Sequence, residues 1–166
     1  RRLGLPAEME EGYIIGAIGR NQPRKRLDLT LMAFAQWIKG YTVRDAYLLL
    51  HVGPTGDAGY DILQLGKYLG ISNRIILAEP EIGMGASEAA LRATYCSLDA
   101  MMTTTQGEGW GLTHMEGMAC GIPQIVPEWS ALGEWASGAA YQVHCTGVDC
   151  TPNNINAIGG IVDQGL

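Results

Sequence analysis

Residues 12–38 read GYIIGAIGRNQPRKRLDLTLMAFAQWI, and this stretch decides the fold. Its first part, residues 12–18, is a continuous apolar run, which predicts a strand buried on both faces. Residues 27–38 repeat apolar side chains at helical spacing and predict an amphipathic helix. A strand, a short loop and a helix in this order are typical of proteins in which helices cover a parallel sheet.

The same alternation continues along the chain. Further strands are predicted at 46–52, 74–78, 100–105, 123–126 and 140–143. Further helices are predicted at 60–69, 87–97, 113–119 and 132–136, with turns or loops at 53–57 and 79–85. Gly70 is placed to end one helix, and Ser87 to cap the next. The pattern predicts an α/β domain spanning 1–166, a Rossmann-like, doubly wound parallel sheet of about six strands. The tail beyond Cys145, rich in Gly, Asn and Thr, is expected to be loop.

Composition and charge exclude several classes of protein. Hydrophobic residues make up 47% and charged residues 17%, which excludes a disordered chain. The net charge of -6 argues against general nucleic-acid binding, which needs fields of Lys and Arg. No apolar run is long enough for a membrane span, and no signal peptide is visible. The chain begins Arg-Arg without Met, so we expect a piece of a longer protein. The parent is expected in the cytoplasm, and attachment to a membrane surface through the missing part is left open.

The cysteines and histidines do not form an obvious site. Cys96 and Cys120 lie in apolar helical contexts and are expected to be small core residues. His144, Cys145 and Cys150 lie close together near the end, which leaves a metal or a disulfide open. Without a second pair of ligands, no metal site is predicted. His51 and His114 stand apart, and His114 is expected to be an exposed or hydrogen-bonded helix residue. The cysteines are expected to be reduced.

The strongest chemical signal is residues 107–123, GEGWGLTHMEGMACGIP. Its glycines let the backbone approach a ligand, and the helix that follows offers free N–H groups to an anion such as phosphate. Glu108 and Glu116 can approach one pocket from two sides, and carboxylates accept hydrogen bonds from sugar hydroxyls. A structural alternative is equally open. Thr113 and Glu116 have the spacing of a helix capping box, in which the glutamate serves only the helix end.

A second loop, residues 19–26, carries four of the eleven basic residues. It is either a solvated loop or a phosphate cradle. The loop follows the first predicted strand, and the glycine-rich loop follows the fourth. Ligands of doubly wound sheets bind beyond the carboxyl ends of the strands, so both loops lie where a ligand is expected.

Residues 108–123 resemble the signature of the family 4 retaining glycosyltransferases. That signature has a Glu-Gly-aromatic-Gly loop, a second Glu eight positions on, and an Ala-Cys-Gly-x-Pro turn. Other motifs of the family follow in the same order, as Gly19-Arg20 with Lys25, Tyr95 with Asp99, and Gly133-Glu134. The resemblance covers roughly residues 12–143.

The resemblance implies a role for each matching residue. Arg20 and Lys25, beside Gly19, would contact the donor diphosphate and stabilise the charge on the leaving group. The N–H groups of the loop would hold phosphate and sugar oxygens, at Gly109, Trp110, Gly111 and Leu112. Glu108 would bind hydroxyls of the transferred sugar, and Glu116 those of the ribose. The nucleotide base would lie near 77–80.

The resemblance also implies the whole reaction. The parent would be a two-domain enzyme of the GT-B fold, and this chain its carboxy-terminal donor domain without the acceptor domain. It would transfer a hexosyl unit from a UDP-, GDP- or ADP-sugar to a hydroxyl of a sugar, lipid or protein, keeping the anomeric configuration. No cofactor or metal is expected, and little activity from the isolated chain. The alternatives are another enzyme on this scaffold, such as a nucleotide-sugar epimerase or a phosphorylase, and a non-catalytic nucleotide-binding module.

Three positions depart from the family pattern. Arg26 stands where the family usually has glycine, which predicts either a crowded loop or one more phosphate contact. The segment before Glu134 lacks the usual proline, and Trp110 is bulkier than the common Phe or Tyr. None of these changes removes a charged residue that the chemistry needs.

Overall fold

A computed structural model describes residues 9, 11–52, 59–78, 86–150, 158–163 and 165. Its centre is a six-stranded parallel sheet in the order β3-β2-β1-β4-β5-β6. The strands are β1 (Tyr13–Gly19), β2 (Ala46–Val52), β3 (Ile75–Leu77), β4 (Ala100–Met102), β5 (Gln124–Pro127) and β6 (Tyr141–Val143). The strand count and the parallel pairing confirm the predicted fold. The turn and loop expected at 53–57 and 79–85 lie outside the described residues.

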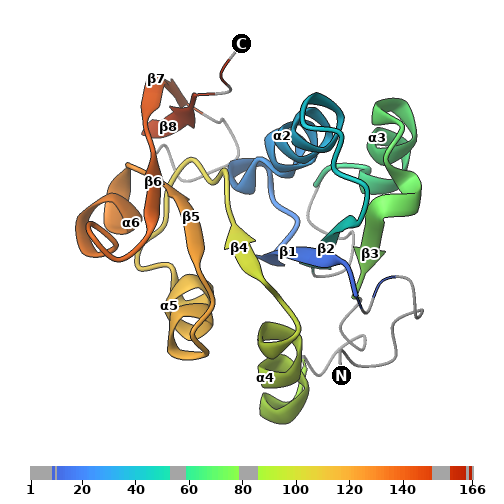
Figure 1. Cartoon of the computed structure of the whole chain (residues 1–166). Coiled ribbons are helices and arrows are strands. Elements are labelled where there is room, and N and C mark those ends of the chain that lie inside the picture. The colour runs from blue at the N-terminus through green and yellow to red at the C-terminus, as the bar shows by residue number, and fades with distance from the viewer. Residues whose placement is uncertain are drawn as a thin grey trace.

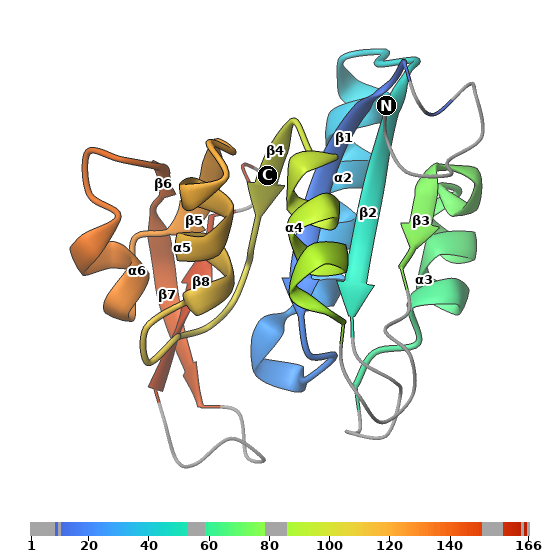
Figure 2. The same cartoon turned by 90° about the horizontal axis from the view of Figure 1, so that it is seen from below.

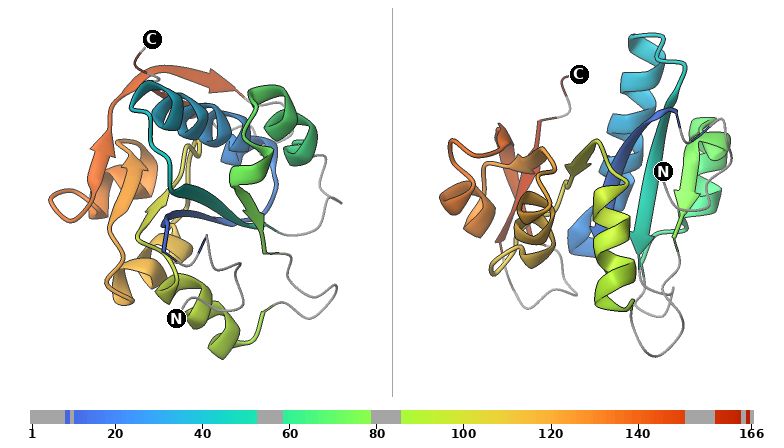
Figure 3. Two further views of the ribbon diagram at one scale, coloured as in Figure 1. Left: turned by 45° about the vertical axis from the view of Figure 1, so that its right-hand side comes forward. Right: turned by 60° about the horizontal axis from the view of Figure 1, so that its bottom comes forward.

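Helices cover both faces of this sheet. They are α2 (Leu27–Gly40), α3 (Ile62–Leu69), α4 (Glu88–Cys96), α5 (Leu112–Ala119) and α6 (Ser130–Trp135), with short 3₁₀ turns η1 (Pro23–Lys25) and η3 (Ser72–Arg74). Figure 1 shows α2 and α3 on one side of the strands and α4 and α5 on the other. Figures 2 and 3 show the same layering around β1 from other directions. The molecule is therefore a doubly wound domain, as the sequence predicts.

The central strands are buried on both faces, and successive residues serve different cores. Ile15 and Leu48 belong to the core beneath α2, together with Phe34. Ile14 and Leu49, their immediate neighbours in sequence, belong to the core beneath α4. Because side chains alternate across a strand, a strand covered on both sides must be apolar at every position. This explains the continuous apolar runs from which the fold was predicted.

Two helix boundaries follow the local signals in the sequence. Gly70 ends α3 in the left-handed conformation, with φ 69°, where glycine carries no steric penalty. Ser87 caps α4, because its Oγ accepts a hydrogen bond from the amide of Ala90 at 3.2 Å. Both predictions are confirmed.

The fourth strand is shorter than predicted, because two of the threonines that follow it bond to the loop after β1. β4 ends at Met102. Thr104 Oγ1 donates to the carbonyl of Arg26 at 2.6 Å, and Thr105 Oγ1 contacts that of Arg24 at 3.3 Å. These β-branched residues look like strand residues in sequence. Their hydroxyls instead join the loop after β4 to the loop after β1.

The prediction that the tail is loop is wrong. Residues Cys145–Cys150 and Ile158–Val162 form β7 and β8, an antiparallel ribbon, and Figure 1 shows β7 continuing from β6. The glycines that suggested a loop allow close approach instead. A Cβ on Gly159 would lie 2.4 Å from the Cβ of Gln106, and one on Gly160 would lie 2.7 Å from Cγ of Trp129. The ribbon therefore packs directly on the start of the glycine-rich loop.

The expectation that Cys96 is a core residue is also wrong. It is the last residue of α4 and is exposed, while Cys120 is partly buried against the core beneath α4. All four cysteines are free thiols. No helix in the described part of the chain is long and apolar enough to cross a membrane.

Candidate functional site

The strand order places the two chemically loaded loops side by side. The order reverses between β1 and β4, because the chain runs outward to β3 before it returns to β4 beside β1. This is the topological switch point, where ligands of doubly wound sheets bind. The two loops are also bonded directly, since the amide of Gln106 donates to the carbonyl of Arg24 at 2.8 Å. The prediction that they share one place in the fold is confirmed.

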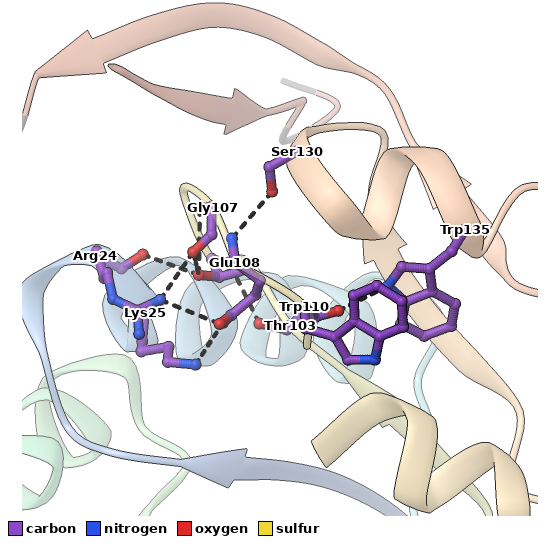
Figure 4. Close-up of polar contacts among 9 residues, drawn as sticks. Arg24, Lys25, Thr103, Gly107, Glu108, Trp110, Ser130 and Trp135 are labelled. Carbon is purple, nitrogen blue, oxygen red and sulfur yellow. Dashed lines mark hydrogen bonds and ion pairs between the residues drawn. The ribbon is translucent and has the colours of Figure 1, made fainter. Parts of the chain in front are cut away.

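Glu108 lies between two cations from the loop after β1, residues 19–26 (Figure 4). Lys25 Nζ contacts its Oε1, and Arg24 Nη1 lies 3.2 Å from its Oε2. The same Nη1 donates to the carbonyl of Gly107 at 2.8 Å. The amide of Glu108 donates to Ser130 Oγ at 3.0 Å. With only 10% of its side chain exposed, Glu108 is held from three sides before any ligand binds.

The surroundings of Glu108 favour its ionised form. Burial by itself raises the pKa of a carboxyl, and it is the largest single influence on Glu108. The charges and hydrogen bonds of Lys25, followed by those of Arg24, together outweigh burial and lower the pKa below its ordinary value. The site therefore carries a fixed carboxylate next to basic groups.

Glu116 lies on α5 in different surroundings. It is exposed, and its Oε2 accepts a hydrogen bond from the hydroxyl of Tyr95 at 2.6 Å. Tyr95 is buried on α4, and burial, followed by the nearby Glu116, raises its pKa. A neutral phenol thus orients the second carboxylate toward solvent.

The capping-box interpretation of Glu116 is wrong. Helix α5 begins at Leu112, and its N-cap is Gly111, so Thr113 lies inside the first turn. Gly111 has no side chain with which to cap this helix end. The first amides of α5 are therefore not taken by a cap of their own, which suits an anion site.

The glycines of the glycine-rich loop, residues 107–111, differ in what they do. Gly111 has φ 85°, and a Cβ there would lie 2.6 Å from Cδ2 of Leu132, so both backbone and packing require glycine. A Cβ on Gly109 would meet no atom within 4 Å. Nothing in the packing calls for glycine at Gly109, and its surroundings are open to a ligand.

Trp110, between these glycines, has a half-exposed side chain whose indole N–H is hydrogen-bonded. Its indole N–H donates to Met115 Sδ at 3.4 Å. Its carbonyl accepts from the indole of Trp135 at 2.7 Å, as Figure 4 shows. Leu112, the first residue of α5, is exposed beside it. The bulky ring is thus accommodated at the surface of the loop, over α5.

The other predicted phosphate residues line one small cleft after β1. Gly19, Arg20 and Lys25 all contribute to it, and Arg20 is exposed. A Cβ on Gly19 would lie 3.7 Å from Lys25 Nζ. The structure therefore places Arg20 and Lys25 at the same edge of the sheet as Glu108, beyond the carboxyl ends of the strands. For the base, only 77–78 of the predicted segment 77–80 lie within the described residues.

Arg26 shows how the chain accommodates the departure from glycine. Its backbone is left-handed, with φ 48° and ψ 48°, a conformation that glycine adopts without strain. Its guanidinium forms hydrogen bonds of 2.9 to 3.3 Å with the carboxylate of Asp28. The guanidinium is thus paired with Asp28, and the crowded loop and the extra phosphate contact both stay predictions.

Sequence reasoning missed two residues that shape the site. Arg24 was visible only as one member of a basic run, and nothing in the run distinguishes the side chain that turns toward Glu108. Ser130 carries no signal at all, because it belongs to a helix that begins 22 residues after Glu108. Its contact exists only in three dimensions.

His114 and His144 have different surroundings. His114 is buried, and its Nδ1 lies 2.8 Å from Oε1 of Gln124, which confirms the hydrogen-bonded alternative for this residue. His144 lies 3.1 Å from the carboxylate of Glu128. Among the residues described, no three His, Cys, Asp or Glu side chains gather as metal ligands.

Comparison with known proteins identifies a family for this chain. Residues 12–158 match the family described as Glycosyl transferases group 1. A D-inositol 3-phosphate glycosyltransferase of Salinispora arenicola is 30% identical over 154 residues, covering 90% of this chain and 32% of the relative. Its counterpart in Mycolicibacterium smegmatis is 31% identical over 87% of this chain and 32% of that protein. The chain thus spans about a third of the length of these curated relatives.

Solved structures show the same fold. The C-terminal domain of a glycosyl transferase group 1 family protein from Francisella tularensis superposes with a TM-score of 0.64 at 25% identity, covering 80% of this chain and 67% of that one. Sucrose-phosphate synthase from Thermosynechococcus elongatus gives a TM-score of 0.68 at 23% identity, over 86% of this chain and 34% of that one. With its family match over most of the sequence, the chain belongs to the glycosyl transferases of group 1.

Proposed function

We propose that this chain is the donor-binding domain of a retaining glycosyltransferase that uses a nucleotide diphosphate sugar. The observation that carries the proposal is the Glu108 carboxylate, held beside Lys25 at the switch point and next to the open glycine loop. A fixed carboxylate suits sugar hydroxyls, and neighbouring basic groups and free helix amides suit a diphosphate.

The proposed mechanism uses charge placed where the transition state develops it. Arg20 and Lys25 stabilise the diphosphate as the bond to the sugar breaks, and the amides from Gly109 to Leu112 hold phosphate and sugar oxygens. Glu108 binds hydroxyls of the transferred hexose, and Glu116 binds the ribose. The acceptor oxygen forms its bond to the sugar carbon on the face from which the phosphate departs, which keeps the anomeric configuration, and the departing phosphate takes the proton of the acceptor hydroxyl. These cations can balance the diphosphate charge, so we propose no further cofactor.

The acceptor side of the reaction lies outside this chain in the proposal. Because the chain spans about a third of its relatives, we propose that another domain of the parent protein binds the acceptor and completes the catalytic site. The relatives are named for D-inositol 3-phosphate, so a phosphorylated cyclitol is one acceptor to include in assays of the parent. The parent is proposed to act in the cytoplasm.

The test is thermal denaturation of the chain with UDP, GDP, ADP and their sugar conjugates. A ligand at 100 times its dissociation constant stabilises the folded state by about 2.7 kcal/mol, which raises the midpoint visibly. We expect one nucleotide to give this shift, Glu116→Gln to reduce it, and the exposed Glu11→Gln to leave it unchanged. A cooperatively folded sample that responds to no nucleotide would contradict the proposal.

A further inference from the structure

Glu108 has two cationic partners, and each contacts a different oxygen. Lys25 contacts Oε1, and Arg24 lies 3.2 Å from Oε2. The side chains are 15% exposed for Lys25, 27% for Arg24 and 10% for Glu108. A carboxylate this well buried needs at least one cation beside it, because removing all partners leaves an uncompensated charge.

The two cations face different places. Lys25 lines the cleft after β1 together with Gly19 and Arg20, where the proposed function puts the donor diphosphate. A diphosphate in that cleft competes with Glu108 for the Lys25 ammonium, which is a flexible point charge that can turn from one anion to the other. Donor binding therefore weakens the ion pair between Lys25 and Glu108.

Arg24 is bound into the loop of Glu108 itself. Its Nη1 donates to the carbonyl of Gly107 at 2.8 Å, next to the carboxylate that it also contacts. Its own carbonyl accepts from the amide of Gln106 at 2.8 Å and from Thr105 Oγ1 at 3.3 Å. The backbone and the side chain of Arg24 therefore both bond to residues 105–107, the segment that leads to Glu108.

We propose that Arg24 is a positioning residue that keeps the Glu108 carboxylate in place for the donor sugar while Lys25 turns to the diphosphate. The proposal rests on the proposed function and deepens it, because it divides the basic loop into two tasks. Arg20 and Lys25 bind phosphate, and Arg24 orients the group that binds the sugar.

Binding of a nucleotide diphosphate and of its sugar conjugate, measured by calorimetry, tests this division. Hydrogen bonds to charged groups contribute about 1.5–3 kcal/mol, so Arg24→Gln should weaken the sugar conjugate about tenfold or more. It should change affinity for the plain nucleotide diphosphate less than about twofold. Arg24→Lys, which keeps the charge, should recover part of the loss. Arg20→Gln should weaken both ligands, and the exposed Arg44→Gln should weaken neither.

The pH dependence of affinity for the sugar conjugate gives a second test, because it would not change if Arg24 only stabilised the fold. Affinity for the conjugate should stay flat from pH 7 to pH 5 in the wild type. In Arg24→Gln it should fall over that range, because Glu108 then depends on Lys25, which the phosphate has taken. Equal losses for both ligands, or no loss for either, would overturn the assignment of Arg24.

A ligand-free measurement keeps this inference separate from the proposed function. Lys25→Met imitates a lysine engaged elsewhere, and carbon NMR of the carboxyl reports the charge of Glu108. Glu108 should remain ionised at pH 5 in Lys25→Met and should become protonated at a higher pH when Arg24→Gln is added. If the double variant titrates like Lys25→Met alone, Arg24 has no such role. If the titrations follow the expectation but wild type binds no nucleotide, only the proposed donor has failed.

Discussion

The two glutamates of the glycine-rich signature lie eight residues apart and in opposite kinds of surroundings. Glu108 is largely buried, with Lys25 and Arg24 on its two oxygens. Glu116 is exposed, and the neutral hydroxyl of Tyr95 donates a hydrogen bond to it. Two identical side chains in one motif therefore depend on the fold in different ways.

The contrast separates Glu108, which contributes to stability as well as to the proposed binding, from Glu116, which contributes little to stability. Replacing Glu108 disturbs the folded state as well as any ligand, because its partners are buried with it. Replacing Glu116 leaves the folded state nearly intact, because it is exposed and Tyr95 loses only one contact. A loss of ligand affinity in a Glu116 variant therefore reports on binding alone, whereas in a Glu108 variant it also includes the effect on folding.

Gly111→Ala should have the largest effect, because Gly111 forms the turn between the two glutamates. The left-handed backbone disfavours alanine by about 1–2 kcal/mol, and overpacking against Leu132 adds about 1–3 kcal/mol. Urea denaturation should show a loss in this combined range. Gly109→Ala is the matched control and should cost less than about 1 kcal/mol, since a Cβ there meets no atom. Equal losses at both glycines would contradict the account of the loop.

Glu108→Gln should destabilise the fold by about 1–3 kcal/mol, because two cations lose their anion in a partly buried place. Glu116→Gln should change the free energy of unfolding by less than about 0.5 kcal/mol. Chemical denaturation of both variants at pH 7 checks this contrast directly. If the two substitutions prove equally harmless, the ion pairs of Glu108 add nothing to stability.

The same contrast should depend on pH. The folded protein lowers the pKa of Glu108 below its ordinary value of 4.5, so its contribution to stability is fully present above that value. The contribution is lost as the pH falls through the folded pKa. The difference in unfolding free energy between wild type and Glu108→Gln should therefore be constant from pH 8 to pH 6 and shrink below pH 4.5. A difference that grows on acidification would have the wrong sign.

Tyr95→Phe tests whether the hydrogen bond from the Tyr95 hydroxyl orients Glu116. Losing the hydroxyl costs about 0.5–1.5 kcal/mol of stability, the usual net worth of a hydrogen bond. Nucleotide affinity should fall less than in Glu116→Gln, because the carboxylate remains but is no longer held. Calorimetry on both variants ranks them, and a larger loss for Tyr95→Phe would place the phenol in direct contact with ligand.

Arg26→Gly should have the smallest net effect. Relief of the left-handed backbone gains about 1 kcal/mol, while loss of the pair with Asp28 costs a similar or smaller amount. Arg26→Ala loses the same pair without the relief and should be less stable than the glycine variant by about 1 kcal/mol. Thermal denaturation of the two variants separates backbone from side chain, and equal midpoints would show that φ 48° is unstrained here.

Much of this architecture could be predicted from the sequence, because it depends on local patterns. Apolar runs such as 46–52 gave strand bounds that the structure reproduces, and Gly70 and Ser87 act within their own helices. The common position of the loop after β1 and the glycine-rich loop followed from strand order in doubly wound sheets. The motif resemblance supplied residue roles that the fold alone could not.

The rest depended on contacts between distant segments. The threonines after β4 have strand propensity, yet their hydroxyls bond to the loop after β1. The spacing of Thr113 and Glu116 fits a capping box, but Gly111 starts the helix too early for one. The roles of Arg24 and Ser130 needed the side-chain directions, which no spacing reveals.

The β7–β8 ribbon has a consequence for anyone who shortens or recombines this domain. The six-stranded sheet is complete at Val143, so a boundary there looks natural. The ribbon nevertheless reaches back to the residue before Gly107, since the amide of Gly160 donates to the Gln106 carbonyl at 3.0 Å and Gln106 Nε2 donates to Asp149 at 3.1 Å. A gene trimmed after β6, or a chimera joined there, would keep its hydrophobic core and lose the outer wall of its glycine-rich loop.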